Sequence, residues 1–126
     1  MNHRYTPLED PDAREVIRQQ HLRTSEVFAQ LLDRLAAAVE PDGSSLIDHT
    51  LVVWVSQIAN GSHALTELPW LVAGDCQGAV NSGQWLQSGE RRGHGQFYRT
   101  VARALDVDIP DFGSDAPGLI PGLLST

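Results

Sequence analysis

Residues 46–74, LIDHTLVVWVSQIANGSHALTELPWLVAG, decide the fold expected for this chain. They contain two short apolar runs, residues 51–55 and 70–73, joined by a polar connection that contains glycine. Each run is too short for a helix and rich in Val, Leu and Trp, so both are predicted to be buried strands. Strands without polar alternation are typical of a parallel sheet covered by helices on both faces.

The connection between the two runs carries the polar residues of greatest chemical interest. Ser56, Gln57, Asn60, Ser62 and His63 follow the carboxyl end of the first predicted strand. In open α/β sheets, ligands bind at this edge. The connection is also about long enough for a crossover between parallel strands, which needs a dozen or more residues. We therefore expect a ligand site here.

A helical pattern precedes this stretch. Asp10 can cap a helix that has Pro at its first position, and apolar residues at spacings of three and four mark one face over residues 28–39. Thr24 or Ser25 could cap a second segment, so one long helix and two shorter ones are both open. The Pro-Asp-Gly sequence that follows ends the helix.

The residues after this stretch complete the predicted organisation. Residues 84–87 are predicted to form a short edge strand, and the apolar spacing of residues 97–105 predicts a short helix. The expected fold is α/β, with a small, mostly parallel sheet flanked by two or three helices. Residues 1–126 are expected to form a single domain, with a polar arm over 1–10 and an irregular apolar tail over 106–126 that docks on the core.

Composition narrows the function classes. Nine basic against sixteen acidic residues give a net charge of −7, which argues against nucleic acid because phosphate neutralisation needs clustered Lys and Arg. No apolar run is long enough to span a membrane, and the amino terminus has no signal-peptide pattern. The lone Cys76 excludes an intramolecular disulfide. The sequence as written is expected to be cytoplasmic, or exported if it derives from a longer parent protein.

Several motifs in order resemble a known family. They are Phe-Ala with Leu-Leu-Asp at residues 28–33, Leu-Ile-Asp at 46–48, Gly-x-His at 61–63, Leu-Pro at 68–69, and Asp-Phe-Gly at 111–113 followed by Gly-Leu. Together they resemble the carboxyl-terminal part of the uncharacterised domain of unknown function 1552 family, in the alkaline-phosphatase-like superfamily. The resemblance covers roughly residues 28–124.

This resemblance implies a site and two functions. In the metal-dependent phosphatases and sulfatases of this superfamily, the carboxyl-terminal half supplies an acidic residue after a strand and a His further along the chain. The matching positions in this sequence are Gln57 and His63. A neutral amide is a poor ligand for a divalent metal. The resemblance therefore implies a non-catalytic or incomplete domain that acts through association with itself or a partner chain. The alternative is part of a metal-dependent phosphate- or sulfate-ester hydrolase with His63 as a metal ligand.

Other residues in the chain offer weaker sites. His63 could pair with Asp48, His49, Glu67, Asp75 or His94 around a divalent metal, although no spacing among them is diagnostic. Asp48 and His49 precede the first predicted strand, so we expect them at the end of that strand opposite to His63. Ser56 or Ser62 could act as a nucleophile with His63 as base, but no nucleophile-elbow pattern surrounds either. Arg91, Arg92 and His94 could attract an anion beside the amino terminus of the following helix.

Three tryptophans bear on partners. Trp54, Trp70 and Trp85 are predicted to cover the sheet or enter the core. If the amino-terminal half of the family's sheet is absent, an apolar face near Trp54 or Trp70 must be covered by something else, because contiguous apolar patches are seldom left bare. The chain is therefore expected to form a homo-oligomer or to bind a partner protein.

Overall fold

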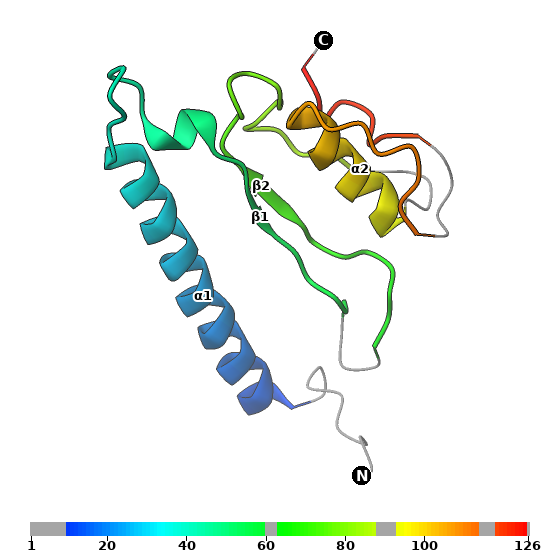
Figure 1. The fold of residues 1–126 in the computed structure, drawn as a ribbon. Helices are drawn as coiled ribbons and strands as arrows, with labels where there is room; N and C mark the ends of the chain where they lie inside the picture. The colour runs from blue at the N-terminus through cyan, green and yellow to red at the C-terminus, as the bar shows by residue number, and fades with distance from the viewer. Residues whose placement is uncertain (1–9, 60–62, 88–92, 114–117, 126) are drawn as a thin grey trace.

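A computed structural model describes residues 10–59, 63–87, 93–113 and 118–125. The elements in chain order are α1 (Pro11–Ala37), the 3-10 helix η1 (Leu46–His49), β1 (Val52–Trp54), β2 (Leu71–Ala73) and α2 (His94–Ala104). Figure 1 shows the two strands between α1 and α2. The architecture is therefore mixed α/β, as the sequence predicts at that level.

Helix α1 is continuous, which decides between one helix and two. The Asp10 carboxylate accepts hydrogen bonds from the amides of Asp12 and Ala13 at 3.0 and 3.3 Å, and a proline follows the cap. The Thr24 and Ser25 hydroxyls donate to carbonyl oxygens four residues earlier, so both residues lie inside the helix rather than at a boundary.

The sheet is antiparallel, so the prediction of a mostly parallel sheet was wrong. Val52 pairs with Ala73, Val53 with Val72 and Trp54 with Leu71. Among the described residues of the connection there is no helix, and without a crossover element the second strand returns beside the first in the opposite direction. The polar connection is thus the end of a long hairpin.

The two faces of this strand pair contact different elements. Val53 and Val72 belong to the face that packs against α2, where the Trp70 and Phe97 ring centroids are 4.5 Å apart. On the opposite face Trp54 meets Phe28 of α1, with ring centroids 5.2 Å apart. The strand pair is therefore the middle of three layers.

The described core lies on the α2 side. Its buried hydrophobic residues are Val80, Phe97 and Leu123, and partly buried side chains of both strands and of the tail pack around them. An isolated bridge joins Val80 to Leu124, so residues near the carboxyl end lie directly on this cluster. Burial on the α1 side is much lower, since no residue of α1 is buried.

Residues 84–87 form no strand, contrary to the prediction. The side-chain amide of Gln84 donates to the carbonyl oxygens of Asn81 and Gly122 at 3.0 and 2.7 Å, which ties this segment to the tail rather than to a strand. Trp85 is 85% exposed and so is not part of the core. The apolar residues of this run therefore did not predict a strand correctly, because Gln84 bonds to the tail and not to a neighbouring strand.

Candidate functional site

The predicted ligand residues of the connection lie at the far end of the hairpin. Ser56 is half-buried; its hydroxyl donates to the carbonyl oxygen of Ile58 at 2.7 Å, and its own carbonyl oxygen accepts from the Trp70 indole at 3.0 Å. Gln57 and His63 are exposed, and His63 has a φ of 62°. Asn60 lies outside the described residues, as does Ser62. The Ser56 hydroxyl is thus held by the backbone rather than by a base.

The predicted anion site is only partly described. Arg91 and Arg92 lie outside the described residues. His94 is the first residue of α2, and its ring lies against Trp70, with centroids 4.7 Å apart. This aromatic contact packs the start of α2 onto the strand pair, which is a structural role for the His94 ring.

A different histidine lies among possible metal ligands. Within the described part of the chain, the group of His, Cys, Asp or Glu side chains whose ligand atoms come together consists of Glu40, Asp42 and His49, with these atoms all within 4.8 Å of one another. His49 Nε2 is 3.5 Å from a Glu40 carboxylate oxygen. His63 does not belong to this group.

The turn that follows α1 positions these three residues. An isolated bridge pairs Val39 with Ser45, and the amide of Glu40 donates to the Ser44 carbonyl oxygen at 2.9 Å. Gly43 has a φ of 89°, the left-handed conformation that a tight turn needs and that glycine adopts without steric cost. The turn therefore brings Glu40 and Asp42 back beside η1, which carries His49.

A chain of hydrogen bonds runs through the group. The Ser44 hydroxyl donates to Asp42 Oδ1 and lies 2.8 Å from His49 Nε2, while the Gln77 side-chain amide lies 2.6 Å from His49 Nδ1. The hydrogen bonds from the Ser44 hydroxyl and amide, aided by the nearby His49, hold the pKa of the Asp42 carboxyl below its usual value. Asp42 therefore stays ionised, and ready to ligate a cation, into acidic solution.

Gln77 reaches His49 because of an unusual turn. Over residues 74–78 every residue except Asp75 has a positive φ, including Cys76 at 52° and Gln77 at 60°. Such a conformation costs a side-chain-bearing residue about 1–2 kcal/mol. The Gln77 amide donates to the Asp48 carbonyl oxygen at 2.6 Å, so backbone and side chain of Gln77 both engage η1.

Reasoning from the sequence missed Glu40 and Asp42. It assigned Asp42 and its neighbours to the end of a helix, and it placed His49 at the end of the strand opposite to His63. That placement of His49 is confirmed, since His49 precedes β1 and His63 follows it. The spacing of Glu40, Asp42 and His49 matches no diagnostic metal motif, so only the folded turn reveals the group.

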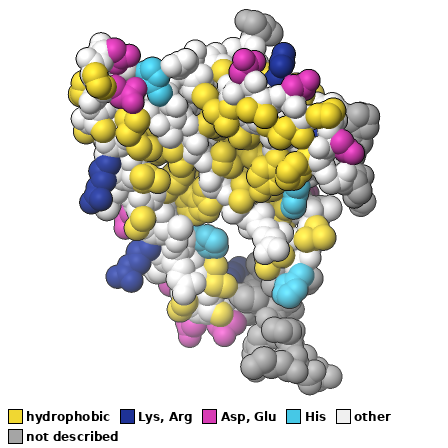
Figure 2. Space-filling view, in the orientation of Figure 1, with side chains coloured by type: hydrophobic (Ala, Val, Ile, Leu, Met, Phe, Trp, Pro, Cys, Tyr) yellow, Lys and Arg dark blue, Asp and Glu magenta, His cyan; other side chains and the backbone are white. Residues whose placement is uncertain are grey.

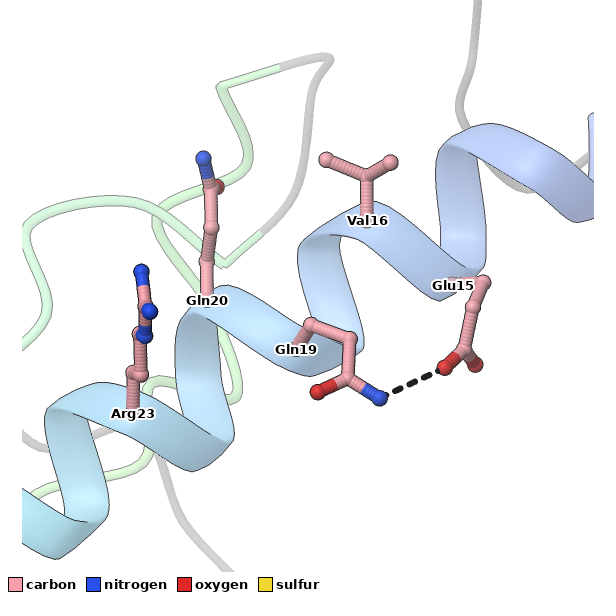
Figure 3. A pocket seen from close by; sticks show the side chains of 5 residues that line it. All are labelled: Glu15, Val16, Gln19, Gln20 and Arg23. Atoms are coloured by element: carbon pink, nitrogen blue, oxygen red, sulfur yellow. Dashed lines mark hydrogen bonds between the residues drawn. The ribbon is translucent and has the colours of Figure 1, made fainter.

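An exposed side of α1 is a second candidate surface. Val16, Gln20, Arg23, Val27 and Leu31 recur at spacings of three and four, and we call this set the outer stripe. Val16 and Val27 are 59% and 64% exposed. Figure 3 shows a shallow pocket in which Val16, Gln20 and Arg23 project from one side of the helix. All the residues that line it come from α1, so the pocket is open on its other sides.

Exposed apolar side chains are not limited to α1. Figure 2 shows hydrophobic side chains gathered over the region between α1 and α2. Large apolar residues of the hairpin and its connection are exposed as well: Val55, Ile58, Leu65 and Leu71. Within the described part of the molecule, only three hydrophobic residues are buried, and many large apolar side chains remain exposed. Exposed apolar side chains that lie together are typical of a contact surface.

Known proteins provide no match from which a family or function could be assigned to this chain. No family model, no curated protein and no solved structure matches the chain. Among the helices of the described residues, none has the length and apolar character needed to cross a bilayer.

Proposed function

We propose that this chain is a non-catalytic association module that binds a second copy of itself through the outer stripe of α1. The observation that carries the proposal is that α1, a helix of 27 residues, has no buried residue. An isolated helix is only marginally stable in water, and in proteins helices draw most of their stability from tertiary packing. A second layer on α1 would supply that packing.

The exposed apolar side chains of α1 support a missing contact. Val16, Val27 and Leu31 are 59%, 64% and 44% exposed. Contiguous apolar side chains are seldom left bare, and a second helix laid along the outer stripe would cover these three.

Charge favours α1 as the surface where two copies meet. Helix α1 contains four acidic residues and four arginines, so its formal charge is zero. The whole chain contains sixteen acidic and nine basic residues, so the remainder has twelve against five and carries the full charge of −7. Contacts between two copies elsewhere would bring like charges together, whereas contacts through α1 avoid that repulsion.

The resemblance to the carboxyl-terminal half of alkaline-phosphatase-like proteins agrees with this proposal. It implies a domain that is incomplete as an enzyme, with Gln57 where a metal-binding carboxylate would stand. The hydrolase alternative requires His63 to act with other metal ligands, and no cluster in the described residues includes it. We therefore favour association over hydrolysis.

A matched pair of variants tests the proposal. Val27→Glu places a charge in the outer stripe, whereas Ala29→Glu places the same charge two residues on, about 200° around the helix. By sedimentation velocity, Val27→Glu is expected to weaken self-association at least tenfold and Ala29→Glu to leave it near the native value. Equal association by both variants, or a native chain that stays monomeric, would overturn the proposal.

A further inference from the structure

We propose that Glu40, Asp42 and His49 form a binding site for one divalent first-row transition-metal ion, with Zn²⁺ the best fit. Their ligand atoms lie within 4.8 Å of one another. Ligand atoms around a tetrahedral Zn²⁺ are about 3.3 Å apart, given bonds near 2.0–2.1 Å. The His49 and Glu40 atoms are already 3.5 Å apart, so small side-chain rotations complete the set.

The imidazole of His49 is oriented as a metal ligand would be. His49 is partly buried, with 27% of its side chain exposed, and its Nε2 lies 3.5 Å from a Glu40 carboxylate oxygen and 2.8 Å from the Ser44 hydroxyl that donates to Asp42. Its other nitrogen, Nδ1, is held by Gln77, which lies 28 residues further along the chain. A metal-bound histidine usually donates its second ring N–H to an acceptor, which fixes both the ring and the tautomer, and the Gln77 side chain can offer its amide oxygen at this position.

Gln77 can support the imidazole in both states. The Ser44 hydroxyl donates to Asp42, so it accepts from a proton on His49 Nε2, and Nδ1 then accepts from the Gln77 amide nitrogen. With the ion bound, the proton moves to Nδ1 and donates to the Gln77 amide oxygen after the amide turns over. The ion then replaces the Ser44 hydroxyl as the link between Asp42 and His49.

The donor set selects the kind of ion. One imidazole nitrogen and two carboxylates suit Zn²⁺, Co²⁺ or Ni²⁺ better than Mg²⁺, which prefers oxygen ligands and octahedral geometry. Three protein ligands leave a position for water, and the exposed side of the group, where Asp42 lies, admits it. Bound there, the ion would link the turn after α1 to η1.

Calorimetric titration of the chelator-treated full chain with ZnCl₂ tests the site. We expect one Zn²⁺ per chain, with MgCl₂ giving no binding at the same concentration. Glu40→Gln with Asp42→Asn, which removes charge but little shape, and His49→Ala should each lower the Zn²⁺ affinity at least tenfold. Gln77→Ala should lower it by about 10–100-fold, as loss of an outer partner does.

Controls separate this site from general binding and from unfolding. Glu26→Gln and His21→Ala change the same residue types on α1 and should keep the native affinity. Circular dichroism checks that each variant folds. The visible absorbance of bound Co²⁺ reports the ligand geometry and is a second readout besides calorimetry. Native affinity in the Glu40→Gln, Asp42→Asn chain, or loss of binding in His63→Ala but not in His49→Ala, would overturn the site.

Discussion

Gly74 joins β2 to the turn that carries Gln77, and it has no room for a side chain. A β-carbon at this position would lie 2.0 Å from the Thr50 carbonyl oxygen and 3.1 Å from that of Ile47. Its φ of 83° is also unfavourable for any other residue. This close backbone contact brings the turn over residues 74–78 against η1.

Gly74→Ala should therefore destabilise the fold by at least about 3 kcal/mol, the upper end of the usual cost of overpacking. Gly78→Ala is the matched control, because Gly78 has a φ of 81° but no atom within 4 Å of its β-carbon position. It should cost only about 1–2 kcal/mol from the backbone conformation. Urea denaturation measures both, and equal losses would show that the contact with Thr50 does not matter.

Glu15 gives a prediction in pH. Hydrogen bonds from Arg18 and Gln19 lower the pKa of its carboxyl from 4.5 to about 2. A lowered folded-state pKa means that the stabilisation is complete above pH 4.5 and is lost as the pH falls through about 2. The pair is exposed, so added salt should weaken it.

Carboxyl NMR titration should find the Glu15 midpoint near 2. Arg18→Gln should move that midpoint up towards 4.5, because the guanidinium that donates two hydrogen bonds to Glu15 at 2.8 Å is gone. A Glu15 midpoint that does not respond to Arg18→Gln would contradict the assigned contact.

At the scale of elements, Thr100 connects α2 to the tail. It is fully buried; its hydroxyl donates to the Gln96 carbonyl oxygen at 2.6 Å and accepts from the Ile120 amide at 2.8 Å. Ile120 packs against the described core together with Leu124. The hydroxyl thus satisfies a tail amide that a purely apolar side chain would leave without a partner.

Thr100→Val keeps the shape of the side chain but removes this acceptor. It should lower the free energy of unfolding by about 1–3 kcal/mol, the cost of a buried polar group left unpaired. Thr100→Ser keeps the hydroxyl and loses only a methyl group, so it should cost less. Thermal denaturation ranks the two, and a Val variant as stable as the native chain would contradict the role of the hydroxyl.

The elements also show which parts of the fold a sequence can predict. Asp10, the proline after it and the apolar spacing predicted α1, and the spacing after residue 97 predicted α2, because capping and helical periodicity are local. The direction of β2 could not be predicted, since an apolar strand carries no local mark of its partner's direction. The predicted strand over residues 84–87 was wrong for a similar reason, because Gln84 bonds to Gly122 of the tail, which is distant in the sequence.

The candidate metal group could not be predicted for a related reason. Its ligands are contributed by the turn after α1 and by η1, and its outer partner comes from a turn 28 residues beyond His49. The sequence instead directed attention to His63, where a polar connection follows a strand. The folded chain brings Glu40 and Asp42 to His49 through the Gly43 turn, which in the sequence indicates only that a helix stops.

At the scale of the whole molecule, the three layers are unequal. The α2 side holds the described core of Val80, Phe97 and Leu123, whereas on the other side Phe28 of α1 meets Trp54 and no residue of α1 is buried. A monomer with this distribution would leave one layer weakly attached. Association through the outer stripe would place a second helix on α1 and make that layer part of a larger core.

Sedimentation equilibrium of the native chain over a range of concentrations measures whether two copies associate. We expect a mass that rises towards twice the 13.8 kDa of one chain as concentration increases. Val27→Glu should shift this rise to at least tenfold higher concentration, while Ala29→Glu should not. A mass that stays at one chain throughout, in a protein whose circular dichroism shows its full helix content, would contradict association through α1.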